Sequence, residues 1–269
     1  MCVRTSGTTH TTKRHNFRLT RLYPRVPTVP RIPLIEDLTT GSVPAGSVLL
    51  VEFAGASQWY NASVTIAAGW LKQGGKVSYN AAAQSPDDVR SVLNRLGVNF
   101  EEYEKEDRLR IWDFYTASLG KKSNEKYAYG SLKVADLSLR IAKEDMLEAP
   151  QPEWLRVIDN SSTWYRFNDE KAMMEVELTR FIPSFKLRKS TALRAIMRDV
   201  HSNWVIQQLE GVIDFIVREE YVLVIRGKSS KPCDCGRSIL CVRLWWCAPP
   251  HPHTRKSNAC HLRSKAREY

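Results

Sequence analysis

The sequence predicts an α/β protein with a mostly parallel central sheet, helices on both faces and an antiparallel hairpin at the C-terminal edge. Strand-like apolar runs alternate with helix-like segments from residue 46 to residue 228, the pattern of βαβ units. The first run, 46–55, is continuously apolar, as expected of a parallel strand buried on both faces. Right-handed crossovers between such strands place helices on both sides of the sheet.

The first half of the chain supplies the clearest elements. Residues 46–55 predict a strand, and residues 63–75 have apolar side chains at helical spacing and end in two glycines that suit a helix C-cap. A second strand is expected at 76–82. The helix at 85–97 has the strongest start signal, because a serine cap precedes proline at the first helical position and two aspartates at the positive end of the helix dipole.

The second half continues the alternation. The predicted elements are a strand at 108–115, a helix at 131–147, a strand at 154–162, a helix at 170–189, a strand at 191–200, a short helix at 202–211, and strands at 212–220 and 221–228 that form the edge hairpin. In such sheets, ligands bind beyond the carboxyl ends of the strands. We therefore expect residues 55–63, 81–84 and 159–162 to share one rim.

The net charge of +11 arises at the two ends of the chain. Residues 1–31 hold seven basic and no acidic residues, and residues 32–227 hold 24 basic and 27 acidic ones, a net charge of −3. Solvated, disordered ends account for this pattern, and nucleic-acid tethering is the minority alternative. The predicted organisation is a disordered, proline-rich segment at 1–31, one domain at 32–228, and a tail at 229–269.

The tail is rich in cysteine and histidine. Five of the six cysteines lie there, together with three histidines (Cys233, Cys235, Cys241, Cys247, Cys260, His251, His253 and His261). Zinc is one interpretation, but the C-x-C spacing at its start matches no standard finger, and we prefer disorder or a gene-end artefact. The chain has no apolar run of membrane-spanning length and no signal-peptide pattern at its start, so we expect a cytoplasmic protein.

Four blocks in order carry a family resemblance. Residues 32–55, 71–113, 155–162 and 190–202 resemble the KaiC-like branch of the RecA-type ATPases, of the prokaryotic signal-transduction type, and the likeness extends over residues 32–228. It implies a RecA-like, three-layer fold of the P-loop NTPase type. It also implies a phosphate-binding loop after the first strand and a site shared between subunits of an oligomer.

The phosphate loop of that family, the Walker A motif G-x-x-x-x-G-K-[ST], is degenerate in this sequence. With Gly55 as the first glycine, Tyr60 replaces the second, Asn61 the lysine, and Ala62 the hydroxyl residue. Ser63 supplies a hydroxyl only if the register slips by one. Residues 54–71 contain no basic residue, so no register restores the lysine.

The carboxylates of the family are reduced in number as well. The resemblance places two glutamates after the second strand to orient or deprotonate the attacking water, and here Ala83 and Gln84 stand in their places. Asp159 matches the magnesium-associated aspartate at the end of a later strand. The residues of a vestigial nucleotide site are therefore Gly55, Ser57, Asn61, Ala62, Ser63 and Asp159, with no catalytic residue and no metal ligand assigned.

These losses predict a protein that acts by association. We expect a non-hydrolysing regulatory or scaffolding partner in signalling, with protein partners or an oligomer, no cofactor, and no nucleic-acid or membrane partner. The alternative is an ATP- and Mg²⁺-binding ATPase of the same superfamily, active in an oligomer that supplies the missing cation. His201, a lone histidine after a strand, is expected to cap or pack rather than to catalyse.

Overall fold

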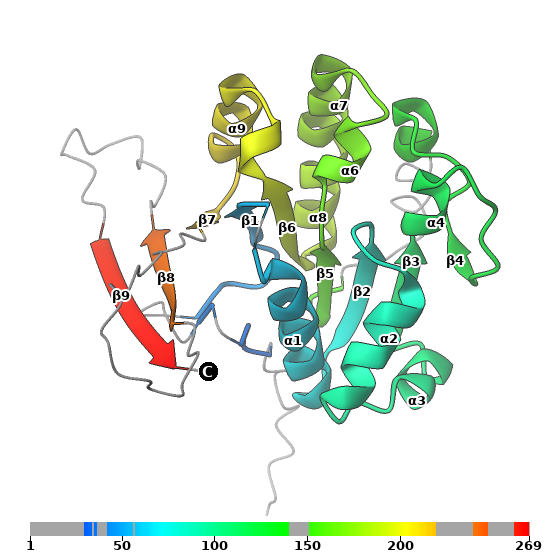
Figure 1. The fold of residues 1–269 in the computed structure, drawn as a ribbon, viewed down its shortest axis with the longest axis vertical. Helices are drawn as coiled ribbons and strands as arrows, with labels where there is room; N and C mark the ends of the chain where they lie inside the picture. The colour runs from blue at the N-terminus through cyan, green and yellow to red at the C-terminus, as the bar shows by residue number, and fades with distance from the viewer. Residues whose placement is uncertain are drawn as a thin grey trace, which may run out of the picture.

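The sheet has seven strands, all parallel, in the order β4-β3-β2-β5-β6-β1-β7 (Figure 1). The computed structural model describes residues 30–33, 35–36, 42–55, 57–139 and 151–218 with their side chains, and the backbone of two later strands. The strands are β1 (Val48–Phe53), β2 (Lys76–Ala81), β3 (Leu109–Asp113), β4 (Tyr127–Ala128), β5 (Trp154–Ile158), β6 (Thr191–Met197) and β7 (Phe215–Arg218). The predicted α/β class and RecA-like architecture are confirmed.

Helices cover both faces of this sheet (Figure 1). They are α1 (Trp59–Lys72), α2 (Pro86–Arg95), α3 (Phe100–Lys105), α4 (Tyr115–Ser118), α6 (Ser162–Tyr165), α7 (Glu170–Val176), α8 (Ile182–Arg188) and α9 (Asn203–Glu210), and residues 134–139 are also helical. A π-helical turn, η1 (Glu177–Phe181), joins α7 to α8, and a 3₁₀ turn, η2 (Arg198–Val200), follows β6.

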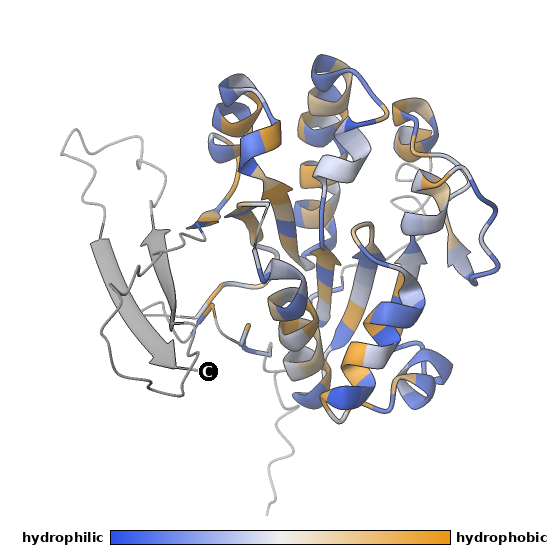
Figure 2. Cartoon of the chain, in the orientation of Figure 1, coloured by the Kyte–Doolittle hydropathy of each residue, from blue (hydrophilic) through white to orange (hydrophobic). Residues whose placement is uncertain are grey.

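Alternation along β1 divides the core into two layers. Leu49 and Val51 pack with α1 and α2, whereas Val48 and Leu50 pack with α8 and α9 on the opposite face. All four side chains are almost completely buried, which explains why the strand reads as one continuous apolar run. The central strands are mostly hydrophobic, whereas the helices carry both hydrophobic and hydrophilic residues (Figure 2).

Two helices differ from the prediction at their ends. The predicted helix at 170–189 is divided by the wider π turn just before Pro183, a residue that lacks the backbone N–H of a regular turn. Helix α1 begins at Trp59 rather than at Ser63, so much of the expected loop already belongs to the helix. The Ser85 cap of α2 is confirmed, since its hydroxyl accepts the Asp88 N–H and the Asp88 carboxylate accepts the Ser85 N–H.

The chain ends are described only in part. Strand β7 pairs in parallel with β1, and the partner strand predicted at 221–228 lies outside the described residues. The same is true of residues 1–29. Within the tail, the structure describes the backbone of β8 (Ile239–Trp246) and β9 (His261–Glu268), which pair antiparallel. Among the described residues, no helix is long and apolar enough to span a membrane.

Candidate functional site

The three predicted rim segments meet at the carboxyl ends of β1, β2 and β5. The indole N–H of Trp59, from the β1–α1 connection, donates to the Asp159 carbonyl oxygen at 2.9 Å. The Asp159 carboxylate in turn accepts the Ala82 N–H at 2.9 Å, across to the β2–α2 connection. Direct hydrogen bonds therefore join segments that are about a hundred residues apart in the chain.

The Asp159 carboxylate serves the loop beside it. It accepts the backbone N–H of Ala82 and that of Ala83, the latter at 3.1 Å to Oδ1 and 3.3 Å to Oδ2, and the residue is only 1% exposed. Burial raises its pKa to about 7, although the backbone hydrogen bonds from Ala82, Ala83 and Asn160 act in the opposite direction. Asp159 therefore holds the loop that contains Ala83, the position at which the family resemblance places a glutamate.

The inner side of the first turn of α1 is filled by protein. Trp59 is 6% exposed and belongs to the apolar layer under α1. Ser63, fully buried, donates to the Tyr60 carbonyl oxygen at 2.8 Å, and its hydroxyl lies 2.7 Å from that of Tyr79 on β2. These contacts occupy the side of the helix that faces Asp159.

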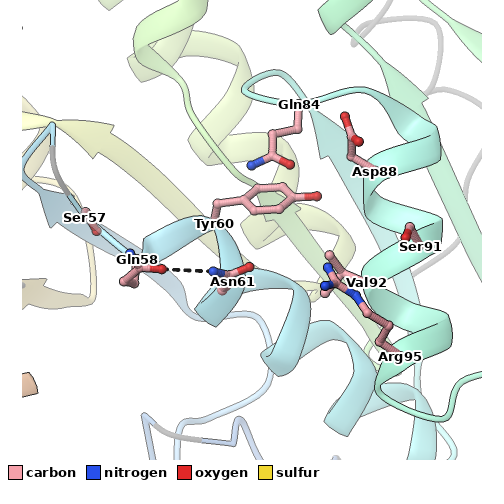
Figure 3. A pocket seen from close by; sticks show the side chains of 9 residues that line it. All are labelled: Ser57, Gln58, Tyr60, Asn61, Gln84, Asp88, Ser91, Val92 and Arg95. Atoms are coloured by element: carbon pink, nitrogen blue, oxygen red, sulfur yellow. Dashed lines mark hydrogen bonds between the residues drawn. The ribbon is translucent and has the colours of Figure 1, made fainter. Parts of the chain in front are cut away.

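The outer side of the same turn borders a cavity of about 260 Å³ between α1 and α2 (Figure 3). Tyr60 reaches from α1 toward α2, and the side chain of Arg95 reaches back toward α1 (Figure 3). Amide, hydroxyl and charged groups form most of the wall. The lining residues are Ser57, Gln58, Tyr60, Asn61, Gln84, Asp88, Ser91, Val92 and Arg95.

Several polar groups of this wall have no partner within the part of the chain that the structure describes. The Tyr60 hydroxyl is covered and accepts or donates no hydrogen bond there. Burial, followed by the charges of Asp159 and Asp88, raises the pKa of Tyr60, and Arg95 opposes this shift. Arg95 is exposed and no carboxylate of the described residues lies within ion-pair distance of it.

The first turn of α1 adds positive potential to the same cavity. Its N-cap, Gln58, makes no capping hydrogen bond, and the turn has no acidic side chain to offset the helix dipole. The Gln58 amide oxygen instead accepts the Asn61 side-chain N–H at 2.9 Å (Figure 3). On the opposite wall, Asp88 is already engaged by the Ser85 cap of α2.

The six predicted site residues do not share one open surface. Ser57 and Asn61 line the cavity, and Gly55 lies exposed in the turn after β1. Ala62 is half-buried against the apolar layer, and Ser63 and Asp159 are buried. The cavity residues on α2 were not predicted from the sequence. Their signal was the spacing of Asp88, Ser91, Val92 and Arg95, which places them on one face of a helix.

His201 lies in a Ser–His–Glu arrangement that the sequence did not reveal. Its Nε2 is 2.8 Å from the Ser162 hydroxyl, and its Nδ1 is 3.6 Å from the Glu170 carboxylate. Burial lowers the pKa of His201, which favours the neutral ring. The serine is 2% exposed and its oxygen also accepts the Met197 N–H, so it lacks the access that a nucleophile needs.

Two arginines on β6 and in the turn after it form ion pairs. Arg194, on β6, is fully buried and pairs with Glu177 of the π turn, under the rings of Trp164 and Phe181. Arg198 lies 3.3 Å from the buried Glu52 carboxylate. Among the residues with described side chains, no cluster of histidine, cysteine or carboxylate side chains could hold a metal ion. The cysteines of the tail lie outside that part, so the zinc hypothesis stays a prediction.

Comparison with solved structures identifies the fold. The chain is similar to the KaiC-like protein PH0186 of the hyperthermophilic archaeon Pyrococcus horikoshii OT3, with a TM-score of 0.53, 15% identity, and coverage of 87% of this chain and 92% of that one. It is also similar to the uncharacterized protein PH0321 of Pyrococcus horikoshii, solved with an unknown peptide, at a TM-score of 0.56, 15% identity, and coverage of 86% and 97%. No family model and no curated protein matches the sequence.

The fold is therefore the KaiC-like, RecA-type fold that the four sequence blocks predict. Identity of 15% supports the architecture alone, because proteins that share a fold can differ in their chemistry.

Proposed function

We propose that this protein works through contacts with other proteins, as a non-hydrolysing regulatory or scaffolding member of a signalling system. The observation that carries the proposal is the charge at the rim. The β1–α1 connection and most of α1 lack any basic side chain from residue 54 to residue 71, and the carboxylate of Asp159, where the three segments meet, is buried and bonded to amides.

The sizes of these energetic effects favour a protein that acts by binding partners over one that hydrolyses ATP. A triphosphate needs several charge-assisted hydrogen bonds, each worth roughly 1.5–3 kcal/mol, and backbone amides at one helix end supply only some of them. Removing one transition-state donor typically costs about 10² to 10³ in rate. A rim without a lysine and without a base lacks two such groups together, so hydrolysis at a useful rate is not expected.

A protein of the same fold gives independent support for association. The solved structure of PH0321 contains a peptide of unknown identity. A polypeptide partner is therefore compatible with this architecture, and the partner of this chain is expected to be a protein rather than a nucleic acid or a membrane. The proposed role in signal transduction rests only on the resemblance to the KaiC-like branch.

The alternative is an ATPase that is completed in an oligomer. RecA-type sites lie between subunits, so a neighbouring subunit could supply the missing cation in trans. Helix N-termini favour anions even without lysine, and α1 has an N-terminus with no acidic first turn. ATP and Mg²⁺ are the cofactors that this alternative requires.

The two functions separate in an equilibrium binding measurement. A fluorescent ATP analogue with Mg²⁺ is titrated with the full chain at micromolar concentration, and phosphate release is followed in the same samples. We expect a dissociation constant weaker than about 1 mM and no turnover.

Two lysine variants test whether the missing positive charge at the rim limits ATP binding. Asn61→Lys returns a cation to the position of the family lysine, and Asn94→Lys adds the same charge to the exposed face of α2 outside the cavity. Micromolar affinity with turnover in the unmodified chain would establish the alternative and end the proposal.

A further inference from the structure

The cavity between α1 and α2 has features that the rim lacks. It is bounded by one guanidinium, Arg95, that no described carboxylate pairs with, and by the half-buried amide of Gln84, which makes no hydrogen bond within the described residues. The covered hydroxyl of Tyr60 is likewise without a partner there. The exposed guanidinium and the half-buried amide are therefore free to bind a ligand that enters the cavity.

The charges around the cavity indicate what charge a ligand should carry. Arg95 carries one positive charge, and the N-terminus of α1 adds about half a charge, while Asp88 carries one negative charge that the start of α2 and Ser85 already stabilise. The net charge around the cavity is therefore slightly positive, which suits a ligand with one negative charge. It does not suit the three or four charges of a nucleoside triphosphate, for which several cations are needed.

The size of the cavity narrows the choice further. Its volume of about 260 Å³ lies below the range, from roughly 300 Å³ upward, that is typical of pockets for drug-sized ligands. A side chain presented by another protein fits this volume. A carboxylate would accept hydrogen bonds from the guanidinium, and the amides of Gln84 and Asn61 would flank it.

We propose that this cavity binds an aspartate or glutamate side chain of a partner protein. The assignment rests on the proposed function, because a protein that works by association needs a surface that recognises its partner. Arg95 makes the charge-assisted contact, the Gln84 amide provides a hydrogen bond beside it, and Asp88 excludes a second negative charge.

The test uses two neutral-ended peptides that differ only in charge. The ¹⁵N-labelled full chain is titrated with acetyl-Gly-Glu-Gly-amide and, separately, with acetyl-Gly-Gln-Gly-amide, and chemical shifts of the backbone and of the Arg95 Nε–H are followed. We expect the glutamate peptide to shift the signals of Tyr60, Gln84 and Arg95 and to bind at least about fivefold more tightly than the glutamine peptide.

Two matched variants test whether binding of the glutamate peptide depends on the positive charge of Arg95. Arg95→Gln should weaken binding of the glutamate peptide by about tenfold or more. Lys105→Gln, which removes an exposed cation of α3 outside the cavity, should leave binding unchanged. Unchanged backbone spectra away from the cavity show that each variant is folded.

Three outcomes would overturn the assignment: equal binding of the two peptides, binding that survives Arg95→Gln, or no response up to about 100 mM peptide. The proposed function is judged separately, by ATP turnover. A chain that neither hydrolyses ATP nor binds the glutamate peptide would retain the proposed function and lose only this site.

Discussion

The first turn of α1 has two sides that differ in almost every respect. On the inner side, Trp59 and Ser63 are buried, and their polar atoms bond to Asp159 and Tyr79. On the outer side, Tyr60 and Asn61 face a polar cavity that includes the exposed Arg95. One turn of helix thus separates a buried region, whose polar side chains are hydrogen-bonded, from a cavity with polar side chains that can bind a ligand.

The difference indicates that the two sides of this turn have different roles. The buried carboxylate of Asp159 connects the end of β5 to the amides after β2, a structural task that needs no phosphate. Recognition is then free to occur on the outer side, where side chains can change without disturbing the sheet. Disruption of the inner side should therefore cost stability, and changes on the outer side should alter binding alone.

The largest expected effect is the loss of Trp59. Trp59→Ala removes a buried side chain and the indole bond to Asp159, and should lower the free energy of unfolding by about 3 to 5 kcal/mol. Trp204→Ala is the control, because Trp204 is 42% exposed on α9 and should cost less than about 1 kcal/mol. Urea unfolding measures both. Equal losses would mean that the inner side is not specially bonded.

Removal of the Asp159 side chain comes next. Asp159→Ala leaves the buried N–H of Ala82 and the part-buried N–H of Ala83 without their acceptor, at a cost of about 3 kcal/mol in total. The exposed Asp199→Ala in the turn after β6 should change stability by less than about 0.5 kcal/mol. An Asp159→Ala variant as stable as the parent would show that the carboxylate is not a structural connector.

The raised pKa of Asp159 predicts a pH dependence of moderate size. Its pKa is about 7 in the fold and about 3.9 when unfolded, so between these values the native state binds the extra proton. The free energy of unfolding therefore decreases by up to about 1.4 kcal/mol per pH unit as pH rises from about 4 to 7. This contribution is complete below pH 4 and lost above 7.

The comparison with Asp159→Asn isolates that contribution, since the amide cannot ionise. The difference in unfolding free energy between the variant and the parent should shift in favour of the variant from about pH 5 to pH 7 and then level off. Parallel pH profiles for the two proteins would contradict the burial of this carboxyl group.

The smallest expected effect is on the outer side. Asn61→Lys should tighten the binding of an ATP analogue by about tenfold, through one added charge-assisted contact, and should leave stability unchanged. Asn94→Lys, with the same charge outside the cavity, should give less than about a twofold change. If the two variants behave alike, the effect is one of net charge and the cavity plays no part in it.

Much of the fold could be predicted because its signals are local. The serine cap and proline at the start of α2 and the continuous apolar run of β1 each depend on neighbouring residues. The common rim followed from the rule that parallel strands end on one side. These features need no knowledge of distant contacts.

The site itself depends on contacts between distant residues, and the sequence did not reveal them. The bond from Trp59 to Asp159 spans 100 positions, and the bond from Asp159 to Ala82 spans 77. Periodicity placed Ser63 at the start of a helix, whereas the helix begins at Trp59 because that indole is anchored in the core. The π turn before Pro183 was not predicted either, and its first residue, Glu177, pairs with Arg194 of β6, which is 17 positions away in the chain.

The most direct test of the central claim is hydrolysis of Mg²⁺-ATP by the full chain beside Asp159→Asn, which preserves the shape of the side chain. Both proteins are expected to release phosphate at the rate of buffer alone, whether dilute or concentrated enough to associate. Turnover by the parent chain that the folded Asp159→Asn variant loses would contradict that claim, because a carboxylate that only holds a loop has no part in cleaving phosphate.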